Sequence, residues 1–182
     1  PQLTDTTVTS ILGVQNTGSI EDLSPNYEEV RAYDLAGSIP SEKYPDPDYT
    51  ASCLMGVDKQ HQIYILDVKR FRKRYAGVVD DIIQQGLRDQ EDWGEVTTFI
   101  PEDPSSAGKA ACAQMLGDIN AHGVLVKKMK TSNIKNRKLR AFEPFAVVAE
   151  NNMVSVVKDD WNEMFHEELE VFDPSVRISG VH

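Results

Sequence analysis

Residues 31–36 read Arg-Ala-Tyr-Asp-Leu-Ala, a run typical of a short β-strand with one carboxylate, Asp34, inside it. An aspartate in an apolar strand is costly to bury, so either the strand lies at a rim or the charge has a cationic partner such as a metal ion. A second acidic strand end, Phe99-Ile100-Pro101-Glu102-Asp103, follows much later in the chain, ahead of a small-residue turn and a helix. Carboxylates so far apart in sequence can share a cation only if their strands are neighbours, and we expect that they are.

Apolar alternation predicts three antiparallel strands, over residues 28–36, 49–57 and 62–68. Three prolines exclude regular structure from the connection 37–48, which we expect to be a surface loop. Residues 1–27 are rich in Thr, Ser, Gly and Asn, and they predict an extended arm or linker ahead of one domain, residues 28–182.

The second half of the chain alternates helices with strands. Its patterns predict helices over residues 75–88 and 160–172, a helix that Ser105 or Ser106 caps, and a helix containing Pro144. They also predict a fourth strand over 96–100, a fifth strand over 124–126 and a small strand over 152–157. A strand, a helix and a strand in succession make a βαβ unit, so the fourth and fifth strands should be parallel. This order predicts an α/β fold of the RNase H-like type, a mixed five-stranded sheet flanked by helices, with Asp34 and Glu102-Asp103 on neighbouring strands.

Composition limits the classes of function. The chain has 182 residues, 40% of them hydrophobic, which suffices for one domain with a sizeable core. No run of eighteen apolar residues is present, so the sequence predicts a soluble intracellular protein. The net charge of −10 argues against general adhesion to nucleic acid. Cys53 and Cys112 are predicted to be buried free thiols.

Two basic runs interrupt this acidic chain. One is residues 69–74, and the other follows the fifth strand, comprising Lys127, Lys128, Lys130, Lys135, Arg137, Lys138 and Arg140. Such local positive surfaces suit contacts with phosphates that do not read sequence. The alternative is a solvated helix face balanced by acids elsewhere.

The acidic strand ends suit hydrolysis of a phosphodiester. Two divalent ions roughly 3.5–4 Å apart can activate the attacking water and stabilise the leaving oxygen, and Mg²⁺ and Mn²⁺ prefer carboxylate oxygens. Asp34, Glu102 and Asp103 are therefore candidate ligands. The alternatives are a strand-edge aspartate paired with Lys or Arg, and an ordinary acidic turn before a helix N-terminus.

A series of short motifs resembles the C-terminal nuclease domain of tailed-bacteriophage terminase large subunits, over roughly residues 29–182. In order, they are Asp34-Leu35-Ala36, Asp48-Tyr49-Thr50-Ala51, Tyr64-Ile65-Leu66-Asp67-Val68-Lys69-Arg70, Ile100 to Lys109, Arg137-Lys138-Leu139-Arg140-Ala141 and Trp161 to Leu169. The resemblance implies an RNase H-like endonuclease that cuts concatemeric double-stranded DNA during genome packaging with two Mg²⁺ or Mn²⁺ ions. It further implies the terminase small subunit and the portal or procapsid as partners, no membrane, and the host cell cytoplasm as location.

By position, the resemblance implies that Asp34 is the first metal ligand and Asp103 the second, with Glu102 as the neighbouring alternative. The family's third acid lies in a His-Asp-Asp run soon after the last helix, whereas this sequence ends at His182, which matches that histidine. We therefore expect a fragment truncated at its C-terminus that lacks a metal ligand, which puts its activity in doubt.

Two alternatives stay open. Another RNase H-like nuclease or recombinase would need a third acid on the last helix, where Glu163, Glu167 and Glu168 are the candidates. A non-catalytic docking module of the packaging motor would keep the fold but bind only a portal or a partner subunit.

Overall fold

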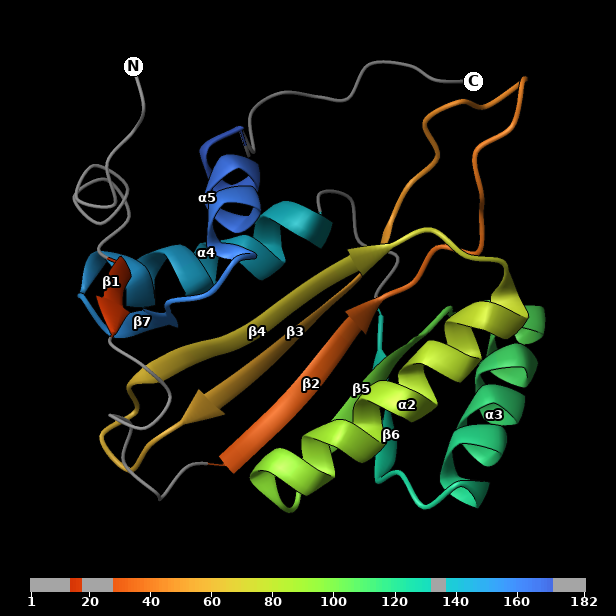
Figure 1. Cartoon of the computed structure of the whole chain (residues 1–182), viewed down its shortest axis with the longest axis horizontal. Helices are drawn as coiled ribbons and strands as arrows, with labels where there is room; N and C mark the ends of the chain where they lie inside the picture. Colours follow the sequence, from red (N-terminus) through yellow and green to blue (C-terminus); the bar gives the residue numbers. More distant parts are fainter. Residues whose placement is uncertain (1–13, 18–27, 132–136, 172–182) are drawn as a thin grey trace. The chain divides into compact units, whose positions relative to one another are not determined.

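The computed structural model describes residues 14–17, 28–131 and 137–171 (Figure 1). The chain divides into two compact units, one formed by residues 24–133 and the other by residues 1–23 together with 134–182. The first unit carries the acidic strand ends.

A mixed sheet of five strands forms the first unit, in the order β4-β3-β2-β5-β6. Neighbours β2, β3 and β4 are antiparallel, whereas β5 runs parallel to both β2 and β6. This confirms the predicted arrangement of three antiparallel strands followed by two parallel ones. The strands are β2 (Glu28–Asp34), β3 (Thr50–Val57), β4 (Ile63–Phe71), β5 (Thr97–Glu102) and β6 (Val126–Lys130).

Four of these strands end at one edge of the sheet. Because β2 and β4 are both antiparallel to β3, they point the same way, and β5 and β6 are parallel to β2. The arrowheads of β2 and β4 in Figure 1 mark this edge, which we call the carboxyl edge. The acidic ends of β2 and β5 therefore meet there, on neighbouring strands.

The strand predicted over 124–126, fifth in the predicted order, corresponds to β6, which begins later, at Val126. Val124 is fully buried just ahead of it, and the strand itself continues through three exposed lysines to Lys130. Its register pairs Thr98 with Val126 and Glu102 with Lys130. The apolar residues mark the core contact and not the strand, because an edge strand can expose charged side chains at little cost.

Helices α2 (Tyr75–Trp93) and α3 (Ser106–Ala121) pack on one face of this sheet. Tyr33 and Ile100 point to the helices and join Ile82 and Ile119 in the buried core. We call this the helix face, and the opposite one the Asp34 face, because strand side chains alternate and Asp34 follows Tyr33 directly. Helix α3 begins after Ser105, whose side chain accepts a hydrogen bond from the Gly108 amide, so the predicted cap is confirmed.

The second unit contains a two-stranded parallel pair and two helices. Strand β1 (Val14–Thr17), inside the predicted arm, pairs with β7 (Val154–Val157). The helices are α4 (Arg137–Glu150), which contains Pro144, and α5 (Asn162–Val171). No helix in the described part of the chain is both long and apolar enough to span a membrane.

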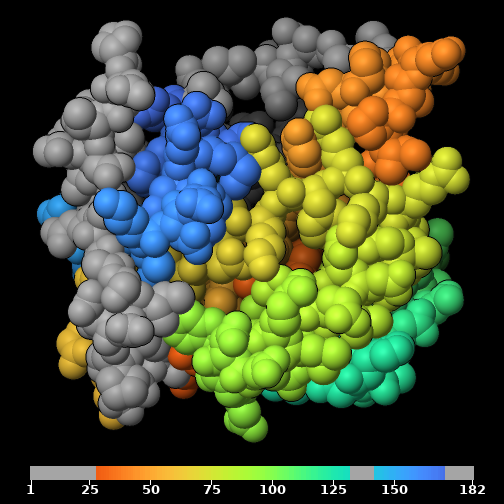
Figure 2. Space-filling view, in the orientation of Figure 1, coloured from red at the N-terminus to blue at the C-terminus, as the bar shows by residue number. Residues whose placement is uncertain are grey.

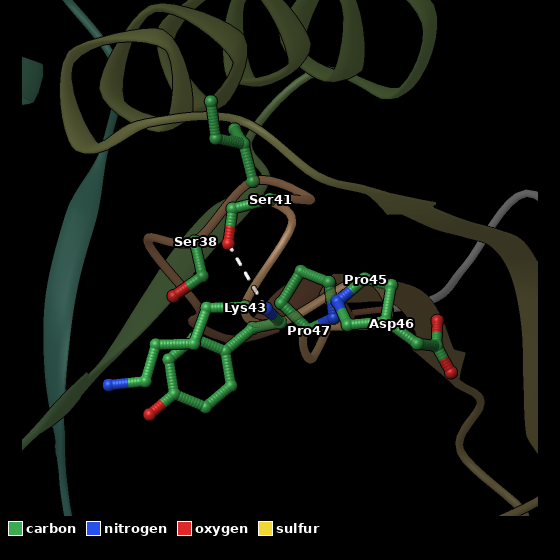
Figure 3. Close-up of a pocket in the computed structure, with 8 residues that line it drawn as sticks. Ser38, Ser41, Lys43, Pro45, Asp46 and Pro47 are labelled. Atoms are coloured by element: carbon green, nitrogen blue, oxygen red, sulfur yellow. Dashed lines mark hydrogen bonds between the residues drawn. The ribbon is translucent and has the colours of Figure 1, made fainter.

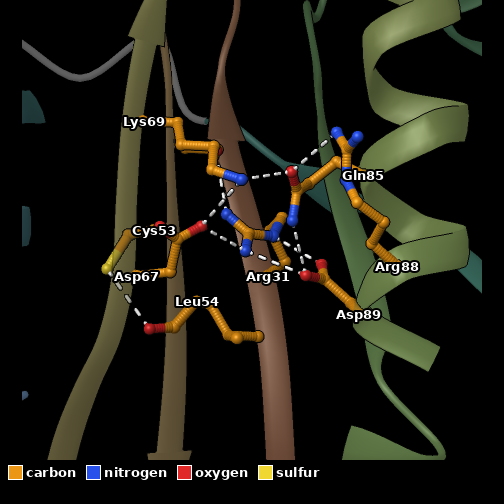
Figure 4. Close-up of polar contacts among 9 residues, drawn as sticks. Arg31, Cys53, Leu54, Asp67, Lys69, Gln85, Arg88 and Asp89 are labelled. Atoms are coloured by element: carbon orange, nitrogen blue, oxygen red, sulfur yellow. Dashed lines mark hydrogen bonds and ion pairs between the residues drawn. The ribbon is translucent and has the colours of Figure 1, made fainter. Parts of the chain in front are cut away.

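A fully buried arginine joins β2 to β3, β4 and α2 (Figure 4). The guanidinium of Arg31 donates to Asp89 of α2 at 2.5 and 3.0 Å, to Asp67 of β4 at 2.7 Å and to Ser52 of β3 at 3.1 Å. Gln85 donates to Asp89 at 2.8 Å and accepts from Lys69 at 2.5 Å. One cation thus contacts three other secondary-structure elements.

These contacts keep the buried charges ionised. Burial lowers the pKa of Arg31, but the hydrogen bond and charge of Asp89, followed by those of Asp67, outweigh it, and the pKa is raised overall. Removing one member of such a network leaves another charge buried without a partner, which is far more costly than replacing all members by apolar groups.

We expect Arg31→Met to lower the free energy of unfolding by about 3–5 kcal/mol, because it leaves Asp89 buried beside an apolar side chain. The double variant Arg31→Met/Asp89→Leu should recover part of that loss, since the stranded carboxylate is gone. Urea denaturation of both variants checks this. A loss below about 1 kcal/mol in the single variant would contradict the assignment of a stabilising role to this network.

Candidate functional site

Asp34 is the last residue of β2 and is exposed at the carboxyl edge. The chain just beyond it is held by Thr50, whose hydroxyl donates to the Ala36 carbonyl at 2.5 Å and accepts from the Ala36 amide at 2.9 Å. Within the described ranges, the Asp34 carboxylate makes no hydrogen bond or ion pair. The buried charge of this strand is Arg31, and Asp34 lies exposed at the end of the strand, so burial alone does not require it to have a cationic partner.

Glu102 ends β5 and already has a cationic partner. Lys128 of β6 donates to its carboxylate at 2.8 Å, and the Thr131 hydroxyl donates to its main-chain carbonyl at 2.6 Å. The hydrogen bond from Lys128, assisted by the charges of Lys128, Lys109 and Lys130 and opposed by desolvation, lowers the pKa of Glu102. Glu102 is therefore fixed as the partner of Lys128.

Asp103 follows β5 and is exposed. Its Oδ1 accepts a hydrogen bond from the Ser105 amide at 2.8 Å, in the turn that begins α3. A Cβ atom on Gly108 would lie 2.4 Å from the Asp103 Cβ and 2.7 Å from its Oδ1. Because Gly108 has no side chain, Asp103 can lie directly against the first turn of α3.

The register of the sheet places the side chains of Asp34 and Glu102 on opposite faces. Ala32 of β2 lies beside Phe99 of β5, so Asp34, two residues further on, is level with Pro101. Since side chains alternate within β5, Pro101 belongs to the Asp34 face and Glu102 to the helix face, and Asp103 follows the end of the strand.

A second observation supports this assignment. The charges of Glu102 and Lys128 both act on Cys112, a buried residue of α3 on the helix face. Asp34 and Asp103 thus lie at the ends of neighbouring strands, and Glu102 belongs to the helix face, opposite Asp34.

The loop between Asp34 and β3 lies at the same edge. It has no helix or strand over residues 35–49, which confirms the predicted loop 37–48 and extends it by the strand ends predicted at 35–36 and 49. The loop encloses an open hollow of about 580 Å³ lined by residues 38, 39, 41 and 43–47. The Tyr44 amide donates to the Ser41 hydroxyl at 3.2 Å, and Lys43 and Asp46 project to opposite sides (Figure 3). The loop's own residues form this hollow.

The predicted basic residues fall into three groups. Lys127, Lys128 and Lys130 are exposed on β6. Arg137, Lys138 and Arg140 lie in α4, in the other unit, and their side chains are outside the described part of the structure. Lys135 is outside it altogether, as is the proposed site residue His182. Their roles in binding DNA or metal stay predictions.

The donor set is hard and incomplete. Across residues 28–131 and 142–170, whose side chains are described, no three His, Cys, Asp or Glu side chains gather closely enough to hold a metal ion. Asp34 and Asp103 supply two carboxylates, which fits Mg²⁺ because that ion is commonly held by one or two carboxylates together with water and substrate phosphates. Both cysteines are free thiols, Cys112 buried and Cys53 half-buried, and burial raises the pKa of each.

Sequence reasoning missed two arrangements in this unit. Arg31 and Asp89 lie far apart in sequence, and no local pattern connects them. The second is a stack of Arg72 on Tyr49, with 3.7 Å between the guanidinium carbon and the ring centroid. Its only sequence signal is the basic run 69–74 after a predicted strand.

In sequence, the chain matches no described protein family and no curated protein. In structure, it is similar to the human cytomegalovirus terminase nuclease domain, with a TM-score of 0.63 and 10% identity over 97% of this chain and 88% of the other. It is also similar to the large terminase nuclease of thermophilic phage G20c, solved with bound cobalt, with a TM-score of 0.53 and 16% identity over 84% of this chain and 74% of the other.

The HK97 bacteriophage large terminase aligns with a TM-score of 0.50 and 13% identity, over 84% of this chain but only 33% of that larger protein. These similarities confirm the predicted RNase H-like fold, in the form found in terminase nuclease domains.

We expect Gly108→Ala to lower the free energy of unfolding by about 1–3 kcal/mol, because the new methyl group overlaps Asp103. Gly117→Ala, at an exposed position of the same helix with open space around it, should instead raise it by about 0.5–1 kcal/mol through helix propensity. Urea denaturation compares the two. Equal effects would mean that Asp103 is not held against Gly108.

We expect Lys128→Met to raise the pKa of Glu102 toward its ordinary value of about 4.3. In the unaltered protein this ion pair contributes stability above that value and loses it as the pH falls through the lowered pKa of Glu102. An NMR titration of the Glu102 side-chain carboxyl carbon measures the change, with Lys128→Arg as the variant that should keep the pKa low. No difference between the two variants would rule out Lys128 as the cause.

Proposed function

We propose that this chain is the nuclease domain of a terminase large subunit, a divalent-metal-dependent endonuclease that cuts concatemeric double-stranded DNA during genome packaging. The observation that carries the proposal is the position of Asp34 and Asp103, two exposed carboxylates at the ends of neighbouring parallel strands. The fold shared with terminase nuclease domains supports it.

Asp34 and Asp103 are the residues that would hold the metal, Mg²⁺ or Mn²⁺, with a third acid needed for two ions. The phage G20c nuclease, a protein of this fold, was solved with bound cobalt. When bound, such ions make water nucleophilic and stabilise the leaving oxygen of the phosphodiester. His182 is proposed to belong to the same site from the resemblance in sequence.

The chain's own residues have separable roles in this site. Thr50 fixes the main chain just beyond Asp34, and the Ser105 amide orients the Asp103 carboxylate through its Oδ1 before substrate arrives. Lys128 holds Glu102 on the helix face, so in this proposal Glu102 is the partner of Lys128 and not a metal ligand. This supports Asp103, and not Glu102, as the second ligand.

DNA would be held by cations next to these acids, because the chain as a whole carries a net charge of −10. Strand β6 lies beside β5, the strand that Asp103 follows, and its exposed lysines suit contacts with the phosphate backbone. The basic residues 135–140 are proposed to extend this surface. In this role the domain would act in the cytoplasm of the host cell with the terminase small subunit and the portal or procapsid.

We expect Asp34→Asn and Asp103→Asn each to weaken Mn²⁺ binding at least about tenfold, since each removes one of two carboxylate ligands. Glu102→Gln, an equal charge change at the carboxylate that pairs with Lys128 on the helix face, should have less than about a twofold effect. Isothermal titration with Mn²⁺ measures binding, and nicking of supercoiled plasmid DNA by the same variants measures activity.

These measurements decide which residue is the second metal ligand and which of the candidate functions holds. Loss of binding in Glu102→Gln but not in Asp103→Asn would transfer the second ligand to Glu102. A protein that binds Mn²⁺ through Asp34 and Asp103 and nicks plasmid behaves as the proposed nuclease. A protein that neither binds Mn²⁺ nor nicks DNA, yet binds a portal or partner subunit, behaves as a docking module.

A further inference from the structure

Arg70 lies in one row with Asp34 across three neighbouring strands. Asp34 of β2 is directly opposite Ala51 of β3, and Ala51 is directly opposite Arg70 of β4. Residues directly opposite each other in antiparallel strands share a face. Arg70 therefore belongs to the Asp34 face, two strand spacings or roughly 10 Å from Asp34 along the sheet, with only the methyl group of Ala51 between them.

Two arginines from the end of β4 cover one aromatic ring. The guanidinium carbon of Arg72 lies 3.7 Å from the centroid of the Tyr49 ring, and that of Arg70 lies 4.8 Å from it. Tyr49 precedes β3 and is 39% exposed, and Arg70 is exposed. A guanidinium that contacts an aromatic face loses conformational freedom and keeps its charge and its N–H donors. The stack thus presents positive charge in a fixed place at the carboxyl edge.

A carboxylate from the loop after Asp34 partly neutralises this stack. Arg72 pairs with Asp46, whose side chain is 86% exposed, whereas that of Arg72 is only 17% exposed. The Nε of Arg72 is buried and has no hydrogen-bond partner within the described residues. In Figure 2 the orange atoms of this loop lie at the surface. Asp46 can be removed without opening the core, which makes it a useful probe of the local charge.

Positive charge therefore lies on both sides of Asp34 on the same face of the sheet. On one side is Arg70, and on the other is Lys127 of β6, which lies beside Phe99 of β5 and hence in one row with Ala32. From β4 to β6 is four strand spacings, roughly 19 Å. The duplex phosphate backbone carries a charge about every 1.7 Å along its axis, so cations at this separation can contact phosphates on either side of the acids.

We propose that Arg70, Arg72 and Tyr49 form a phosphate-contacting arm that holds duplex DNA against Asp34 and Asp103, opposite the lysines of β6. This inference rests on the proposed nuclease function and extends its DNA surface to a part of the sheet that the basic run 127–140 does not reach. Because the guanidiniums occupy the Tyr49 ring, the arm contacts the backbone and does not stack on unpaired bases. The partner is therefore duplex DNA and not a single strand.

The test measures binding of a short fluorescently labelled DNA duplex by anisotropy, in EDTA so that no cleavage occurs, over a series of salt concentrations. Arg70→Gln should weaken binding roughly three- to tenfold and reduce the slope of log K against log salt by about 0.9, the value for one lost phosphate contact. Asp46→Asn should have the opposite sign and tighten binding, roughly twofold or more, because it removes a negative charge from the arm.

Lys59→Gln is the matched control, since Lys59 is an exposed lysine in the β3–β4 turn, at the opposite edge of the sheet, and its loss should change neither affinity nor slope. Tyr49→Phe should bind as the unaltered protein does, whereas Tyr49→Leu should bind as Arg70→Gln does. Circular dichroism and thermal midpoints verify that each variant is folded. Comparison of Tyr49→Phe with Tyr49→Leu separates loss of the tyrosine hydroxyl from loss of the stack.

The outcomes distinguish the two proposals. If the duplex is bound and Lys127→Gln weakens it while Arg70→Gln matches Lys59→Gln, the arm is refuted and the nuclease proposal stands. If Asp46→Asn weakens binding as much as Arg70→Gln does, the ion pair only shapes the loop, which also refutes the arm. Tighter binding of a single strand of the same length refutes the duplex as partner. If the unaltered protein binds no DNA, both proposals fail.

Discussion

The buried charge of Arg31 is the constraint on which the rest of the first unit depends. An arginine inside a central strand must find its partners in the interior, and it finds them on three different elements, Ser52, Asp67 and Asp89. Slippage of β2 by one residue would turn this guanidinium to the other face and leave two carboxylates without their cation. The same slippage would carry Asp34 to the helix face. Correct pairing of the interior charges and correct presentation of the surface carboxylate are therefore one requirement and not two.

Alternation along the strands also divides labour between adjacent acids. Glu102 and Asp103 are chemically similar neighbours, yet the pleat directs the first toward Lys128, and the second lies beyond the strand, exposed in the turn that begins α3. A carboxylate that already holds an ammonium group is a poor candidate for a further cation, because the first partner must leave. The chain thus keeps a structural acid and a candidate chemical acid next to each other without mixing their roles.

Local patterns predicted much of this fold but little of its interior electrostatics. Alternating apolar residues and the prolines of the loop 37–48 placed the three antiparallel strands, and Ser105 placed the start of α3, because these signals act between near neighbours. Val124 misled the prediction of the fifth strand, since burial at a core contact looks like burial in a strand. Arg31 could not have been recognised as buried, because Asp89 completes its site from a distant helix. For the same reason, the arginines over Tyr49 appeared only as part of a basic run.

Strand β4 carries an irregularity that separates its two ends. The register with β3 shifts between Leu54 and Met55, where Leu66 is the extra residue, so the part of β4 that faces the carboxyl edge is paired independently of the part near the turn at residues 58–62. That turn has its own support, because Asp58 accepts hydrogen bonds from the Gln60 and Gln62 amides and from the Tyr64 hydroxyl. Changes of length in the turn can be absorbed at the bulge before they reach Arg70. A peptide tag or a fluorescent reporter inserted there would leave the acidic end of the sheet undisturbed, which gives a handle for following this domain while it works.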